Sequence, residues 1–188
     1  MKKVLKLLSI VIMLTVATIY TMPTSVLAFG PASNEIYNGI DVSEFQRDID
    51  FKKVKSDGIQ VVYIRSSEGT NYIDAKFEQN YKRARDAGLK IGFYHYVTAR
   101  SVNQAEKEAQ FFASVISGKV ADCRLAMDFE SFGNLNKREI NTIGLAFMKK
   151  LEELTKKEVV LYSNAYTASR IWEGEVTKYP LWIAQYEV

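Results

Sequence analysis

Six short apolar runs alternate with segments of helical periodicity, and this alternation constrains the fold more than any other feature of the chain. The runs are residues 39–42, 61–65, 91–97, 125–130, 159–163 and 181–186. They begin about 20 to 35 residues apart, which is the size of a strand–helix–strand unit. Alternation of this kind predicts a parallel sheet covered by helices.

Two of the intervening segments begin with helix start signals. Ser101 with Gln104, and Asn136 with Glu139, have the spacing of capping boxes, and Gly118 is placed to end the first of these helices. Six strands with five crossovers fit either an α/β barrel or a doubly wound sheet, and the pattern alone does not choose between them. No glycine-rich phosphate loop follows a strand, which argues against a nucleotide-binding fold.

The first 28 residues have the layout of a secretory signal peptide. Lys2, Lys3 and Lys6 precede an apolar stretch at 7–20, and residues 26–28 resemble a small-x-small cleavage site. The alternative is an uncleaved membrane anchor, but the apolar stretch is short for a span of about 20 residues. We therefore expect a signal peptide at 1–28, a linker at 29–36 and one domain at 37–188.

Composition excludes several classes of protein. Of 25 basic residues, three lie in the leader, so the cleaved chain carries 22 basic and 22 acidic residues and has no charge excess for nucleic acid. One cysteine and one histidine exclude an internal disulfide and argue against a zinc site, and we expect no metal or cofactor. Cys123 is interpreted as a small buried residue, and His95 either as a hydrogen-bonded structural residue or as a substrate contact.

The run at 125–130 carries the clearest chemical signal. Because strand side chains alternate, Asp128 and Glu130 share one face, about 7 Å apart, at the carboxyl end of the strand. Like charges at this distance raise one pKa, so that one carboxyl can donate a proton while the other stays ionised, as glycosidic bond cleavage requires. Alternatively, both are solvated rim acids or pair with Arg65 or Arg124.

Asp41, in the first strand, is placed to line the same barrel mouth, although it could instead cap a following helix. Aromatic residues also gather at the strand ends: Tyr63, Tyr94, Tyr96, Tyr162, Trp182 and Tyr186. Sugars stack on such rings, but each ring alone is better explained as part of the core.

Several segments, taken together and in order, resemble a known family. They are residues 39–43 with Gln46, 65–69, Tyr72 with Asp74, 88–96, 127–130 and 182–186. From about Tyr37 to Tyr186 the sequence resembles glycoside hydrolase family 25, the muramidases of bacteria, fungi and phages. The resemblance implies a flattened (β/α) barrel of the TIM-like glycosidase type. It also implies hydrolysis of the β-1,4 bond from N-acetylmuramic acid to N-acetylglucosamine in peptidoglycan.

The resemblance also implies roles for individual residues. Glu130 would be the general acid, Asp128 its partner that steadies the acetamido group or the developing charge, and Asp41 a further active-site acid. The residues implied to line the sugar groove are Tyr94, Tyr162, Trp182 and Tyr63. A substrate-assisted route and activation of water by an aspartate both remain open.

Members of this family usually continue past the last strand with a further aspartate, whereas this sequence ends at Val188. We therefore expect a barrel that is incomplete at its C-terminus. The first hypothesis is a secreted, wall-associated monomeric muramidase for wall turnover or lysis, with no membrane anchor after cleavage. The second is an inactive barrel that binds peptidoglycan or is a relic. A third is a glycosidase acting on chitin-like glycans.

Overall fold

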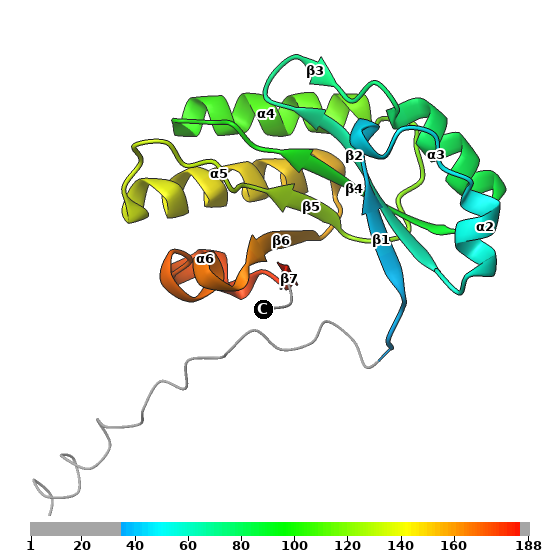
Figure 1. Cartoon of the computed structure of the whole chain (residues 1–188). Helices are drawn as coiled ribbons and strands as arrows, with labels where there is room; N and C mark the ends of the chain where they lie inside the picture. Colours follow the sequence, from blue (N-terminus) through cyan, green and yellow to red (C-terminus); the bar gives the residue numbers. More distant parts are fainter. Residues whose placement is uncertain (1–34, 185–188) are drawn as a thin grey trace, which may run out of the picture.

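The computed structural model describes residues 35–184 (Figure 1). The expected signal peptide at 1–28 and most of the expected linker at 29–36 lie outside these residues. Within the described part of the chain, the helices are all too short or too polar to cross a membrane.

The strands form one sheet whose order follows the chain. They are β1 (Gly39–Val42), β2 (Val61–Glu68), β3 (Tyr72–Ile73), β4 (Lys90–Tyr96), β5 (Leu125–Asp128), β6 (Val159–Asn164) and β7 (Leu181–Ala184). The order is β1-β2-β4-β5-β6-β7, and each neighbouring pair is parallel. The short β3 pairs antiparallel with the end of β2. The predicted parallel sheet is confirmed.

Helices cover one face of this sheet, as Figure 1 shows for the two longest. The helices are α2 (Phe51–Ser56), α3 (Phe77–Asp86), α4 (Val102–Val115), α5 (Lys137–Thr155) and α6 (Ala165–Arg170), with 3-10 turns η1 (Glu44–Gln46) and η2 (Gly174–Lys178). Alternate strand residues such as Ile64, Phe93 and Leu161 are fully buried with Phe112 and Phe147 from α4 and α5. This apolar layer leaves the other set of strand residues facing the concave side.

The two predicted capping boxes differ in outcome. Asn136 Oδ1 accepts from Glu139 N at 3.1 Å and Glu139 Oε2 accepts from Asn136 N at 2.8 Å, so α5 begins with a complete box. Ser101 caps α4, but Gln104 Oε1 accepts the N–H of Arg100 at 2.7 Å, so that the predicted reciprocal bond is absent. The side chain of Gln104 reaches one residue further back and fastens the loop that enters α4.

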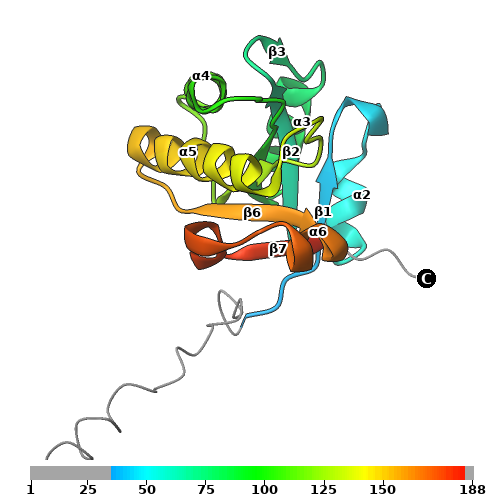
Figure 2. The ribbon, with the colours of Figure 1, turned by 90° about the vertical axis from the view of Figure 1, so that its left-hand side faces the viewer.

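The sheet curls into a half-barrel. The ring of Tyr63 on β2 lies 4.7 Å from that of Trp182 on β7, between strands that a flat sheet would hold far apart. Gly92 on β4 makes this possible, because a Cβ there would lie 2.4 Å from the Tyr63 ring. Figure 2 shows β1 turned toward β6 and β7. Within residues 35–184, β1 and β7 remain unpaired edges. The structure therefore favours the expected incomplete barrel over a doubly wound sheet.

One predicted strand is shorter than expected. β5 ends at Asp128, so the prediction that the strand continues through Glu130 is wrong. The N–H of Val97 donates to Asp128 O at 2.7 Å, and beyond this bond Phe129 turns into a cluster with Phe132 and Trp172. After this bond the chain leaves the sheet, with Phe129 fully buried and Glu130 exposed. Of the predicted run at 181–186, β7 covers the first four residues, and the other two lie outside the described residues.

Candidate active site

Five side chains from five strands enclose a small cavity of about 40 Å³ at the carboxyl ends of the strands. They are Asp41, Tyr94, Asp128, Tyr162 and Trp182. Asp128, Tyr162 and Trp182 come together because they are register partners across β5, β6 and β7. The structure thus brings together five of the seven residues that the sequence suggested. Glu130 follows two residues after Asp128, and Tyr63 lies elsewhere.

Asp128 is the least solvated of the acids. It is only 9% exposed, and its Oδ1 atom has no hydrogen-bond partner. Burial, and then the nearby Glu130 and Asp41 carboxylates, raise the pKa of Asp128 to about 8. The carboxyl group therefore holds its proton at neutral pH, unlike an ordinary surface aspartate.

Asp41 and Glu130 are more open to solvent than Asp128. Partial burial nevertheless raises the pKa of each carboxyl above its ordinary value. Asp41 does not cap a helix, because the η1 turn is capped by Ser43, whose Oγ accepts from the N–H of Phe45 at 3.3 Å. The helix-cap alternative for Asp41 is therefore wrong.

The basic residues suggested as partners for these acids are engaged elsewhere. Arg124 pairs with Glu158 at 2.7 Å. Arg65 donates from Nε to Asp74 at 2.8 Å and from Nη2 to Glu44 at 3.0 Å. Among the described residues, Asp41, Asp128 and Glu130 form no ion pair within 4.0 Å. The mouth thus contains acids that no basic side chain of the described residues pairs with.

The four predicted aromatic residues divide between two places. Trp182 lies edge-on to Tyr162, with ring centroids 5.0 Å apart, and both line the acid cavity together with Tyr94. Burial raises the pKa of the Tyr94 hydroxyl, which is therefore a neutral hydrogen-bonding group. Tyr63 lies one layer deeper, packed on Trp182 and filling the space that Gly92 leaves. It supports the cavity from within the half-barrel and does not line it.

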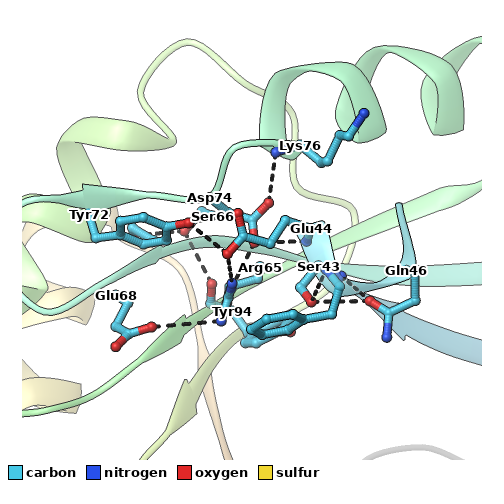
Figure 3. Close-up of polar contacts among 12 residues, drawn as sticks. Ser43, Glu44, Gln46, Arg65, Ser66, Glu68, Tyr72, Asp74, Lys76 and Tyr94 are labelled. Carbon is cyan, nitrogen blue, oxygen red and sulfur yellow. Dashed lines mark hydrogen bonds and ion pairs between the residues drawn. The ribbon is translucent and has the colours of Figure 1, made fainter. Parts of the chain in front are cut away.

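A cluster around Arg65 flanks the cavity, and its composition was not evident from the sequence (Figure 3). Besides Asp74 and Glu44, Arg65 lies 3.7 Å from Glu68. The hydroxyl of Tyr72 donates to Glu44 at 2.6 Å. These bonds fasten the η1 turn, which directly follows β1 and Asp41, to β2 and β3. The sequence signal was the charge pair Arg65 and Glu68 at a strand end, but Glu44 and Asp74 join it only through the fold.

His95 faces the helices and has no access to the cavity. It is fully buried, with Nδ1 2.8 Å from Ser67 Oγ and Nε2 3.4 Å from Glu108 Oε2. Its ring stacks between Phe112 and Phe147, at centroid distances of 5.4 and 5.5 Å. Burial lowers the pKa of His95, so the ring is neutral. The structural interpretation of His95 is confirmed, and its role as a substrate contact is not supported.

A much larger hollow, of about 830 Å³, extends from the amino ends of the strands to Asp41 and Trp182, which also line the acid cavity. Tyr63, Lys90, Lys157 and Cys123 are among the residues that line it. Cys123 is half-buried, and burial raises the pKa of its thiol, which disfavours a reactive thiolate. Within residues 35–184, no group of three or more His, Cys, Asp or Glu side chains is arranged to hold a metal ion.

Comparisons with known proteins agree with this geometry. The sequence model of the family described as glycosyl hydrolases family 25 matches residues 40–188. The autolytic lysozyme of Clostridium acetobutylicum is 39% identical over 155 residues, covering 80% of this chain and 45% of that protein. Lysozyme M1 of Streptomyces globisporus is 33% identical over 172 residues, covering 85% of this chain and 58% of that protein. The chain thus spans about half the length of these curated relatives.

Solved structures share the fold. A bacterial lysozyme from Streptomyces coelicolor superposes with a TM-score of 0.67 at 29% identity, covering 83% of this chain and 77% of that one. A family 25 glycosyl hydrolase from Bacillus anthracis gives a TM-score of 0.69 at 23% identity, covering 85% and 75%, and shows the fold alone.

Proposed function

The chain belongs to glycosyl hydrolase family 25, and we propose that it is a muramidase. The bond that it hydrolyses is the β-1,4 linkage from N-acetylmuramic acid to N-acetylglucosamine in peptidoglycan. The observation that carries the proposal is the cavity where Asp128, buried and with one oxygen unpartnered, meets Asp41 and three aromatic rings. An unsatisfied buried carboxyl is costly to folding, and its position at the carboxyl ends of parallel strands is where barrel enzymes place their chemistry.

In this proposal Glu130 is the general acid. It lies just beyond β5, exposed enough to meet a glycosidic oxygen, and partial burial raises its pKa so that it retains a proton more readily. It donates that proton as the bond to the anomeric carbon breaks, and a water molecule then adds to that carbon and returns a proton to Glu130.

Asp128, protonated at neutral pH, supplies a hydrogen-bond donor inside a poorly solvated cavity. From there it steadies the acetamido group or the charge that develops at the sugar. Asp41 is the further acid at the same cavity. It stands as the candidate to activate water if the substrate itself does not assist.

The rings of Tyr94, Tyr162 and Trp182 bind the sugar residues that flank the cavity, and Tyr63 holds Trp182 from below. Uncharged sugar rings can stack on these aromatic rings, and this stacking positions the glycosidic bond relative to the acids.

The site of action follows from the leader. Residues 1–28 direct export and are removed, so the mature chain, formally neutral, acts on the wall outside the cell as a monomer. Residues 29–188 carry equal numbers of basic and acidic residues and so have no charge excess for nucleic acid.

The test is reducing-sugar release from purified peptidoglycan by residues 29–188, beside Glu130→Gln, with circular dichroism to show that both proteins fold. The variant should lose about 100-fold or more of the activity, because it cannot donate a proton. Chitin oligosaccharides serve as the competing substrate and should be cleaved poorly. A folded parent that releases no sugar would contradict the proposal and favour a barrel that only binds peptidoglycan.

A further inference from the structure

Two aromatic rings stand exposed beside the cavity, outside the groove described above. Phe45, in the η1 turn, is 74% exposed, and Tyr72, on β3, is 40% exposed. Both rings contact the same cation, because Arg65 Cζ lies 4.9 Å from the Phe45 ring centroid and 6.0 Å from that of Tyr72. The two rings therefore form one feature, the Phe45–Tyr72 platform, supported by Arg65.

The fold holds this platform in place by polar contacts on both sides of Phe45. The Glu44 carboxylate accepts from Tyr72 and from Arg65, and the Glu44 N–H donates to Asp74 Oδ2 at 3.0 Å. Figure 3 shows Glu44, Tyr72 and Asp74 gathered around Arg65. A ring fixed in this way loses little conformational entropy when it binds a ligand.

The turn that presents Phe45 is also tight. Ser43 and Gln46 form a capping box around it, with Ser43 N donating to Gln46 Oε1 at 2.7 Å. Arg47 follows with φ 58° and ψ −129°, a backbone region that glycine adopts far more easily. Burial of Phe45 does not explain this geometry, since the ring remains mostly in solvent.

The platform lies along the mouth that holds the acids. Arg65 is the register partner of Tyr94, which lines the acid cavity, and Tyr94 is in turn the partner of Ala126, two residues before Asp128. Two strand spacings separate Arg65 from β5, which is about 10 Å. A glycan strand bound at the cavity can therefore extend over the platform.

Charge decides which ligand fits. Arg65 is surrounded by Glu44, Glu68 and Asp74, so that three carboxylates face one guanidinium. The nearby Lys76 ammonium is bonded to Asp48. This excess of negative charge disfavours phosphate or carboxylate ligands, whereas the apolar face of a neutral sugar can stack on the rings.

We propose that the Phe45–Tyr72 platform is an accessory sugar site, which stacks on an N-acetylhexosamine ring of the bound strand beyond the two sugars that flank the cleaved bond. This inference rests on the proposed function. It predicts that the platform contributes to the cleavage of long strands and contributes nothing to the cleavage of short ones.

The test compares kcat/KM on long, peptide-free glycan strands with kcat/KM on the shortest oligosaccharide that the wild-type protein cleaves. Phe45→Ala should lower the value for long strands about threefold to tenfold and leave the short substrate unaffected, since the loss of one stacking contact has this size. Phe45→Trp should restore the long-strand value. Tyr72→Phe, which keeps the ring and removes the bonds to Glu44, should retain most of it.

Tyr37→Ala is the matched control. Tyr37 is 41% exposed and has Lys90 Nζ 5.2 Å from its ring centroid, but it lines the hollow at the amino ends of the strands. It should change neither value. An equal loss on both substrates for Phe45→Ala, or no loss on either, would overturn the accessory site.

Failure of the proposed function gives a different result, because the wild-type protein then cleaves neither substrate. In that case titration of the long strands into the wild-type protein and into Phe45→Ala decides the question. Weaker binding by the variant supports the platform, and equal binding refutes it.

Discussion

Two buried carboxyl groups, on opposite faces of the same half-barrel, differ in how the fold treats them. Glu108, 2% exposed on the helix side, accepts from Thr98 N and Thr98 Oγ1 at 2.9 Å each and approaches His95 Nε2. Asp128, 9% exposed on the concave side, has one oxygen without a hydrogen-bond partner. The first group is satisfied and the second is not.

The difference separates residues that hold the fold from residues available for chemistry. A satisfied buried carboxylate stabilises its surroundings, whereas an unsatisfied one costs about 1–3 kcal/mol. Cavity volume would not have identified Asp128, because Asp128 lines the cavity of about 40 Å³ and not the hollow of about 830 Å³. A buried carboxyl oxygen without a hydrogen-bond partner, and not volume, distinguishes the acid cavity of this half-barrel.

The largest expected effect is on activity, in which variants of Asp128 and Glu108 should differ. Asp128→Ala should lower kcat/KM on peptidoglycan by about 100-fold, because the variant loses the hydrogen-bond donor at the site of developing charge. Glu108→Gln should leave kcat/KM of the folded protein unchanged. Reducing-sugar release, normalised to folded protein by circular dichroism, measures both. Equal losses in the two variants would show that both faces serve the reaction.

For the free energy of unfolding, the substitution at Glu108 should have the larger effect. Glu108→Ala should lower the free energy of unfolding by about 2–4 kcal/mol, because the Thr98 N–H and hydroxyl lose their buried acceptor. Asp128→Asn should not destabilise the protein at neutral pH. Urea denaturation followed by tryptophan fluorescence gives both values. A Glu108→Ala protein as stable as the wild type would remove the contrast between the two faces.

The smallest effect is the pH dependence that Asp128 imposes. Its folded pKa of about 8 lies above the unfolded value of about 3.9, so between these values the folded state keeps a proton that the unfolded chain has released. The carboxyl therefore lowers the free energy of unfolding progressively as pH rises from about 4 to 8. Asp128→Asn cannot ionise, and its stability relative to the wild type should rise by up to about 1.4 kcal/mol for each pH unit across that window.

Urea denaturation at closely spaced pH values measures this difference. A difference that stays constant with pH would mean that Asp128 is solvated in the folded protein, which would undo its contrast with Glu108.

Much of the fold was predictable because it depends on local pattern. The alternation of apolar runs predicts the parallel sheet, and the strand-end rule groups Asp41 with Asp128 before any contact is known. The length of β5 was not predictable in the same way. Residues 125–130 all suit a strand, but β5 ends at Asp128, and Phe129 packs in the core against Phe132 and Trp172.

The environment of the candidate site depended on longer-range contacts. The sequence offered Arg65 as a partner for the acids, but the guanidinium is taken by Glu44 and Asp74, which the η1 turn and β3 bring to it. The run at 61–65 placed Tyr63 near a strand end, but β2 continues to Glu68, so Tyr63 lies deeper in the half-barrel, where Gly92 leaves space for its ring. Neither outcome follows from residue spacing.

The sequence by itself therefore determined the order of strands and helices and the end of the sheet at which the acids lie. Both follow from side-chain periodicity, which each segment carries independently of the rest. Only the tertiary structure decided how far the sheet curls, through Tyr63 and Trp182, and which carboxyl loses its solvent. The physical reason is that burial and charge pairing are set by residues that are distant along the chain, and these meet only when the sheet has closed around them.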